Sequence, residues 1–185
     1  MEPAQRQIAF LRAINVGGHT VKMDRLRALF GELEFANVAT FIASGNVIFD
    51  APAANTAALE AQIEAHLRES LGYPVVTFLR SPAELAAVAS YAPFAPDELA
   101  AEGHSLYVAF LKAPPNAEAQ RKLLALRNAI DDFQFHGREL YWLARARLTE
   151  SPLFSGAVLE KTIGMPATMR NITTVRKLAH KYPPL

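Results

Sequence analysis

The sequence predicts an α+β fold, a two-layer α/β sandwich that opens with a ferredoxin-like βαββαβ unit. Three observations predict it: short apolar runs typical of buried strands, amphipathic segments with helical spacing between them, and a strand–turn–strand pattern inside the first half. With 185 residues, 51% of them hydrophobic, the chain is long enough for one packed domain or for two small ones that share a core.

A buried strand and a helix come first and flank a glycine loop. The apolar run at residues 8–11 is typical of a strand buried on both faces. Residues 12–21 then form a loop that contains Gly17-Gly18, and a helix begins near Lys22 or Met23. This helix is indicated by apolar residues at helical spacing, namely Leu26, Leu29, Phe30 and Leu33.

A hairpin, a second helix and a further strand complete the first half. Residues 38–42 and 47–49 are expected strands, joined through the turn-forming residues Ser44-Gly45-Asn46. Asn55 is placed to cap the second helix, and residues 75–79 form the strand that follows it. The resulting order of elements is βαββαβ, as in a ferredoxin-like unit.

The second half repeats this order in part. A helix starts at the capping box Ser81-Pro82-Ala83-Glu84 and ends before the two prolines of residues 91–96. We expect residues 1–90 to form the βαββαβ half with a connecting helix and residues 97–185 to form a βαββ half with C-terminal helices, the two making one compact unit. The pattern indicates either a duplicated fold whose second copy replaces its last strand with helices, or a coincidence of a common order. The predicted elements are a strand at 105–111, a helix at 117–129, a hairpin of 133–135 and 140–143, and helical segments near 153–163 and 173–180.

The amino-acid composition argues against several classes of function and of binding site. Nineteen basic residues against eighteen acidic ones argue against a protein that blankets nucleic acid or acidic membrane with positive charge, although a local basic pocket is compatible with them. Without cysteine, disulfides, thiolate metal sites and cysteine nucleophiles are excluded. The five histidines lack metal-ligand spacing, and the phosphate-binding glycine motifs of cofactor sites are absent, so we expect no metal and no cofactor. The polar start and the lack of any apolar run near ~20 residues predict a cytoplasmic protein with no membrane contact.

The first polar cluster lies in the loop after the first strand. Arg12 and Lys22 supply positive charge, and Asn15 supplies a neutral amide. Gly17-Gly18 let the backbone approach a ligand, and the helix that follows presents free N–H groups. The cluster is therefore a candidate for holding an anion. The simpler alternative is a glycine turn with solvated cations.

Two further clusters join it as candidates. Ser44 and Asn46 belong to the predicted hairpin turn, and turn chemistry alone accounts for them. Thr168, Arg170 and Asn171 stand in a hydroxyl- and amide-rich segment before the last predicted helix, where the helix dipole favours a negative charge. A well-capped surface helix is the alternative there. We predict that the three clusters converge on one ligand.

Three segments together resemble a bacterial family called domain of unknown function 1697. They are Phe10 to Gly18 with Val21-Lys22-Met23, then Ile42 to Val47, and Ala167 to Asn171. The resemblance implies an α+β fold and brings no activity, substrate or catalytic residue. The chain departs from the family pattern at Glu34, where relatives usually have glycine, and at Ile172, where an aromatic usually follows the Arg-Asn pair. If the backbone is left-handed at Glu34, that residue costs about 1 kcal/mol relative to glycine.

Three hypotheses about function remain open. The first is a binding protein for a phosphate-bearing partner, either a small molecule such as a nucleotide or a short nucleic-acid element. The second is a hydrolase or transferase, in which His19 or Asp24 has to serve as the general base. The third is a non-catalytic interaction module whose polar clusters brace its loops.

Overall fold

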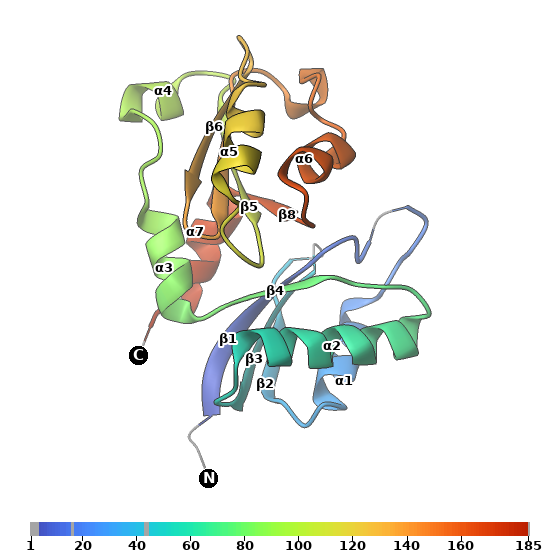
Figure 1. Cartoon of the computed structure of the whole chain (residues 1–185). Helices are drawn as coiled ribbons and strands as arrows, with labels where there is room; N and C mark the ends of the chain where they lie inside the picture. The colour runs from blue at the N-terminus through green and yellow to red at the C-terminus, as the bar shows by residue number, and fades with distance from the viewer. Residues whose placement is uncertain (1–3, 16, 43–44, 185) are drawn as a thin grey trace. The chain divides into compact units, whose positions relative to one another are not determined.

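The computed structural model of the chain describes residues 4–15, 17–42 and 45–184 (Figure 1). Backbone contacts divide the chain into two units, and the division falls inside a helix, between Ala86 and Ala87. The first unit consists of residues 1–86 and 181–185, and the second of residues 87–180. Within the described part of the chain, none of the helices combines the length and the apolar character that crossing a lipid bilayer requires.

The first unit is a four-stranded antiparallel sheet with the strand order β2-β3-β1-β4. Two helices lie along one face of it, and a third helix follows the last strand (Figure 1). The elements are β1 (Ala4–Leu11), α1 (Met23–Gly31), β2 (Ala36–Thr40), β3 (Asn46–Pro52), α2 (Thr56–Leu71), β4 (Thr77–Arg80) and α3 (Pro82–Ser90).

The second unit is also a four-stranded antiparallel sheet, with the strand order β6-β7-β5-β8. Its order along the chain is again βαββαβ, and a helix again follows the last strand. The elements are α4 (Pro96–Ala100), β5 (Ser105–Phe110), α5 (Ala117–Leu124), β6 (Asp131–His136), β7 (Glu139–Ala144), the 3-10 helix η1 (Leu148–Glu150), α6 (Gly156–Ile163), β8 (Thr168–Asn171) and α7 (Ile172–Lys181).

The predicted α+β class and the ferredoxin-like βαββαβ order of the first half are confirmed. The second half contains one strand more than the sequence predicts, because β8 pairs with β5 over four residues. The sequence does not predict this strand, and the reason is physical. Its sequence, Thr-Met-Arg-Asn, is short and polar, and hydroxyl and amide residues before a helix are equally typical of a cap.

The two units share a short sequence at the same structural position. Residues 9–13 read Ala-Phe-Leu-Arg-Ala, and residues 109–113 read Ala-Phe-Leu-Lys-Ala. The Leu11 N–H donates to the carbonyl of Gly45 at 2.9 Å, and the Leu111 N–H donates to the carbonyl of Arg138 at 2.9 Å. In both units the first strand therefore ends with the same bond to the turn of the neighbouring hairpin.

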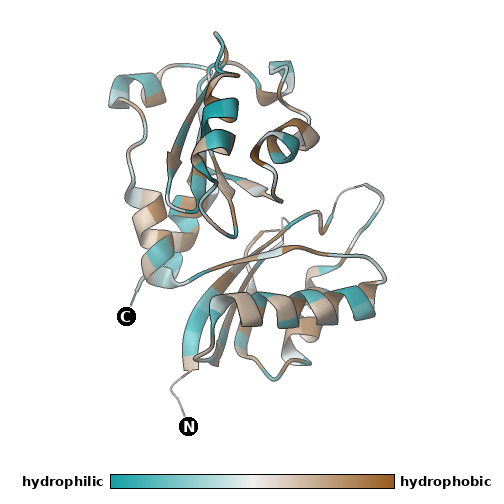
Figure 2. Cartoon of the chain, viewed as in Figure 1, coloured by the Kyte–Doolittle hydropathy of each residue, from teal (hydrophilic) through white to brown (hydrophobic). Residues whose placement is uncertain are grey.

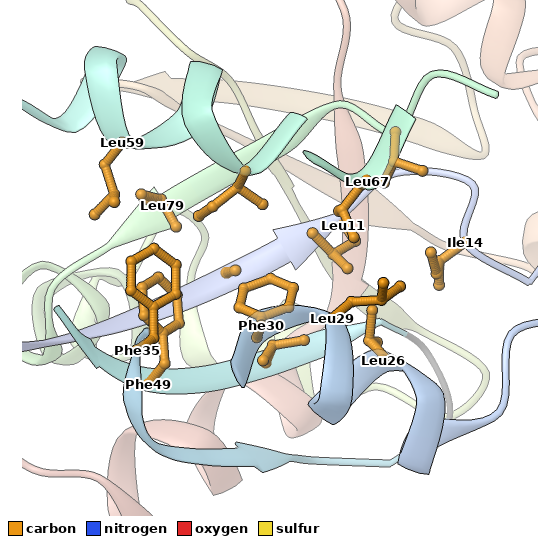
Figure 3. Close-up of a cluster of buried hydrophobic side chains, with 14 of the residues drawn as sticks. Leu11, Ile14, Leu26, Leu29, Phe30, Phe35, Phe49, Leu59, Leu67 and Leu79 are labelled. Atoms are coloured by element: carbon orange, nitrogen blue, oxygen red, sulfur yellow. The ribbon is translucent and has the colours of Figure 1, made fainter. Parts of the chain in front are cut away.

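Each unit has a hydrophobic core between its sheet and two helices. In the first unit, leucines and phenylalanines of α1 and α2 gather with those of the strands (Figure 3), and Phe35 stacks on Phe49 with ring centres 4.6 Å apart. Figure 2 shows hydrophilic and hydrophobic residues alternating along α2, as expected for a helix with one buried face. In the second unit, Trp142 and Phe133 pack under α5 and α6 with Leu123.

In each unit, glutamate side chains accept hydrogen bonds from backbone N–H groups of an edge strand or of the residue just before it. The N–H groups of Thr77 and Leu79 in β4 donate to Glu64 at 2.8 Å and to Glu60 at 2.9 Å, both on α2. In the second unit the N–H of Ala167, just before β8, donates to Glu160 of α6 at 3.0 Å. Because unpaired edge N–H groups invite pairing with another chain, these contacts protect both edges.

Candidate functional site

The loop between β1 and α1 is held in a defined shape by its own backbone and amide groups. The N–H of Arg12 donates to the carbonyl of Val76 at 2.9 Å, which continues the pairing of β1 beyond its end. Ile14 is buried and anchors the loop to the core. The Oδ1 of Asn15 accepts a hydrogen bond from the N–H of Val21 at 2.7 Å and closes the loop across six positions. The amide of Asn15 therefore already has a bracing role in the chain.

The β2–β3 turn packs directly against this loop. At Gly45 the backbone is left-handed, with φ of +75°, and a Cβ there would lie 2.5 Å from Cγ2 of Ile14, closer than carbon atoms approach. Only glycine is compatible with that position. Asn46 is fully buried and donates from Nδ2 to the carbonyl of Phe41 at 2.9 Å. Ser44, the remaining predicted residue of this turn, lies outside the described residues.

Two of the four described non-glycine residues with positive φ lie in this loop and this turn. Ala13 has φ of +59° and Ile42 has φ of +51°, conformations that cost non-glycine residues about 1–3 kcal/mol each. Ile42 is β-branched, which makes the conformation more costly, and 54% of its surface is exposed. Strained, over-determined backbone of this kind is frequent at ligand-binding sites.

Lys22 occupies the N-cap position of α1. It is exposed, its backbone is extended, and its own side chain makes no capping hydrogen bond. The positive end of the helix dipole lies at this terminus, so a lysine there is electrostatically unfavourable. The other long helix of the unit differs, because the Oδ1 of Asn55 accepts from the N–H groups of Ala57 and Ala58 at 2.9 and 3.3 Å. The start of α1 thus combines an exposed lysine with a first turn that Asn55-type capping does not satisfy, and Asp24 is the acidic residue in that turn.

The predicted third cluster is divided by the strand that contains it. Thr168 and Arg170 lie in β8 and share one face, and Nη1 of Arg170 donates to the hydroxyl of Thr168 at 2.9 Å. Asn171 alternates to the other face and accepts from the N–H of Thr173 at 2.8 Å, at the start of α7. The expectation that all three residues crowd the start of one helix is therefore corrected. Only Asn171 caps the helix.

Arg170 has a counterpart in the first unit that the sequence analysis did not single out. In the register of the two sheets, Arg80 pairs with Ile8 as Arg170 pairs with Val108. The two guanidinium groups also make the same contact, because Nη1 of each donates to the preceding carbonyl, at 2.7 Å for Arg80 and 3.0 Å for Arg170. Burial lowers the pKa of Arg170 to about 10, so the side chain stays cationic at neutral pH.

Arg12, Asn15, Lys22 and Asn46 thus lie in the β1–α1 loop and the β2–β3 turn of the first unit, and the loop and the turn meet at Ile14 and Gly45. Thr168, Arg170 and Asn171 belong to the second unit. The internal repeat at residues 9–13 and 109–113 is the signal that could have pointed to Arg80, because an equivalent first strand implies an equivalent last strand.

The residues considered for acid–base catalysis are engaged elsewhere. The ring of His19 is exposed and stacks on Tyr73, with centres 3.8 Å apart. The carboxylate of Asp24 is 89% exposed and pairs with Arg27 on the next turn of α1. Among the residues that the structure describes, no group of three histidine, aspartate or glutamate side chains is arranged to hold a metal ion.

Comparisons with known proteins agree with this fold. Residues 4–141 match the model of a family whose description is "Protein of unknown function (DUF1697)". The structure of a conserved bacterial protein, SP0830 from Streptococcus pneumoniae, is similar with a TM-score of 0.70 and 18% sequence identity. The similarity covers 96% of this chain and 98% of the other, and at this identity it concerns the fold alone. Among curated proteins there is no match.

Proposed function

This chain belongs to the family described as protein of unknown function DUF1697, and we propose that its β1–α1 loop binds the phosphate group of an anionic ligand. The ligand class is a phosphate-bearing small molecule, such as a nucleotide, or a short nucleic-acid element. With a net charge of +1, the protein has no general attraction for polyanions, so affinity has to come from a local arrangement of donors.

The observation that carries the proposal is the position of Lys22. A lysine at the N-cap, whose side chain makes no capping hydrogen bond, reduces the stability of the isolated protein. An anion bound at the same place reverses the sign of this interaction, because it meets both the lysine and the free N–H groups of the first helical turn. A residue that is unfavourable for folding and favourable for binding is typical of a functional site.

The other predicted residues divide into two roles. Arg12 belongs to the same loop and provides a second cation, which is suited to phosphate because guanidinium can donate two parallel hydrogen bonds. Asn15 and Asn46 act as braces, since their amides hold Val21 and Phe41. The braces fix the loop before the ligand arrives and so reduce the ordering cost of binding.

Binding of phosphate-bearing compounds tests the proposal. We expect a thermal-shift screen of nucleotides, phosphorylated metabolites and oligonucleotides to contain a stabilising compound, and a ligand at 100 times its Kd adds about 2.7 kcal/mol to the free energy of unfolding. Lys22→Asn should then weaken its binding by about tenfold, while Lys22→Arg, which keeps the charge, should bind within about threefold of the unaltered protein. Equal affinity of Lys22→Asn and the unaltered protein would contradict the proposal.

A bracing role is the second candidate, and specific contacts favour it for Arg170. Its contact with the carbonyl of Met169 repeats the contact of the buried Arg80 with the carbonyl of Leu79, and its guanidinium also donates to the hydroxyl of Thr168. On this reading Arg170→Ala lowers the free energy of unfolding by about 1–3 kcal/mol and leaves the affinity for any ligand unchanged. The sequence analysis predicts instead that Arg170 and Arg12 bind one ligand, and on that prediction Arg170→Ala weakens ligand binding. In that case the two alanine variants weaken binding non-additively in a double-mutant cycle.

A further inference from the structure

A polar cavity in the second unit has the features of a separate binding site. It lies where the start of β5 meets the start of α7 and has a volume of about 200 Å³. Five of the residues that line it have polar side chains: His104, Ser105, Asn171, Thr173 and Arg176. None of the described acidic side chains lines this cavity, so its walls are neutral or cationic.

The polar atoms of these five side chains are largely unused by the described chain. The amide of Asn171 accepts from Thr173 N–H through Oδ1, which leaves its two Nδ2 hydrogens available. Arg176 makes one long contact, from Nε to the carbonyl of Ala89 at 3.5 Å, and its terminal nitrogens have no partner among the described residues. The hydroxyls of Ser105 and Thr173 likewise have none there. Donors on a strand and a helix therefore surround one small space.

His104 adds a group of fixed orientation. Its Nδ1 lies 2.7 Å from the carbonyl of Glu98, and because a carbonyl only accepts, Nδ1 carries the hydrogen. The neutral ring then has Nε2 as an acceptor. A wall that combines several donors with one acceptor is complementary to an oxyanion that also bears an O–H group.

The equivalent position in the first unit differs from this cavity in how its cation is paired. A cavity of about 490 Å³ lies there between the start of β1 and the start of α3. It contains a cation, Arg6, but Asp50 receives two hydrogen bonds from that guanidinium, at 2.9 and 3.3 Å. By the register of the sheets, the positions of Arg6 and Asp50 correspond to Leu106 and Leu143 in the second unit, so this carboxylate has no counterpart there.

We infer that the cavity between β5 and α7 binds a phosphomonoester through Arg176, Asn171, Thr173 and Ser105, with Nε2 of His104 accepting the P–O–H of the monoanion. The volume of about 200 Å³ exceeds that of a phosphate group, so it also admits the adjoining part of the ester. Three terminal oxygens match the number of donors better than the two of a carboxylate. The inference concerns a different set of residues from the β1–α1 loop and does not depend on it.

Inorganic phosphate is the probe, observed through the backbone amide signals of the full chain in 15N-resolved NMR spectra. We expect saturable shifts of the signals of Ser105 and Thr173. Arg176→Gln should weaken binding by about tenfold, the value of one hydrogen bond to a charged group. Lys177→Gln changes another exposed cation on α7 that does not line the cavity, and it should change binding by less than about twofold. Acetate should shift these signals far less than phosphate does.

Two results would overturn the inference: no saturable shift at Ser105 and Thr173, or equal weakening by Arg176→Gln and Lys177→Gln, which indicates unspecific charge attraction. Ser105→Ala provides a second variant that removes one donor and no charge, and it should weaken phosphate binding without altering the spectrum of the free protein elsewhere. The signals of Gly17 and Gly18 report the β1–α1 loop in the same titration. Lys22→Asn should leave the shifts at Ser105 unchanged. The titration therefore tests phosphate binding at the cavity and at the β1–α1 loop independently.

Discussion

The two units have one topology but connect their first strand to their first helix in different ways. In the first unit residues 12–22 form a long loop with two glycines and a strained alanine, and Lys22 begins the helix. In the second, the connection after Phe110 runs only to Asn116 and contains Pro114 and Pro115. There the Oδ1 of Asn116 accepts from the N–H of Ala119 at 2.8 Å and caps α5.

The comparison of the two connections shows which features the βαββαβ topology requires and which features the first unit has in addition. The proline-containing, capped connection stabilises the fold in the ordinary way, because prolines restrict the unfolded chain and the cap satisfies a helix N–H group. The first unit needs the same connection and instead has strain, glycine and an unfavourable charge. The same scaffold without these features folds in the second unit, so they are not requirements of the topology.

The largest effect is expected where the loop meets the β2–β3 turn. Gly45→Ala should lower the free energy of unfolding by about 2–3 kcal/mol, because the new Cβ overlaps Ile14 and the left-handed backbone disfavours it. Gly17→Ala is the matched control, since Gly17 has φ of +63° but open space around it, and it should cost about 1 kcal/mol. Chemical denaturation measures both. Equal losses would mean that the turn does not support the loop through this contact.

A smaller effect of opposite sign is expected at the end of α1. Glu34 has φ of +61°, so the condition under which the sequence analysis gave this residue a cost, a left-handed backbone, is met. Glu34→Gly should therefore raise the free energy of unfolding by about 1 kcal/mol. Glu32→Gly, two residues earlier in right-handed backbone, should lower it and serves as the control. A loss of stability in Glu34→Gly would show that the glutamate has a compensating contact.

The smallest effect concerns the ion pair that only the first unit has. The hydrogen bond from Arg6 holds the pKa of Asp50 below its ordinary value, and Asn37 adds to this effect. A lowered folded-state pKa contributes stability above the unfolded pKa, and this contribution is lost as pH falls through the folded value. Asp50→Asn should thus lose less than about 1 kcal/mol at neutral pH, since Arg6 is 38% exposed, and should show a weaker decline in acid. An unchanged acid limb of the stability curve would contradict this.

Local signals in the sequence were sufficient for much of the fold. Asn55 caps α2, and Ser81 and Glu84 exchange hydrogen bonds at 2.8 and 3.2 Å as a capping box. These features depend on residues within a few positions of one another, and so do the apolar runs of β1 and β5. The glycine turn at Gly45 was also predicted, but the reason for glycine, its contact with Ile14, depends on a distant part of the chain.

The candidate sites were less predictable because they depend on register. Thr168, Arg170 and Asn171 are adjacent in sequence, yet strand alternation places Asn171 on the other face. The cavity beside Arg176 joins residues about 70 positions apart, which no local pattern connects. The repeat of Ala-Phe-Leu with a basic residue is the one sequence feature that could have revealed both the second βαββαβ unit and the shared cavity position.

The most direct test of the account exchanges the two cap residues, Lys22 and Asn116, between the units. Lys22→Asn should raise the free energy of unfolding by about 1 kcal/mol and weaken phosphate-ligand binding, while Asn116→Lys should lower the free energy of unfolding by about the same amount and leave binding unchanged. If Lys22→Asn instead destabilises the ligand-free protein, the lysine serves the fold, and the proposal that it is retained for an anion is contradicted.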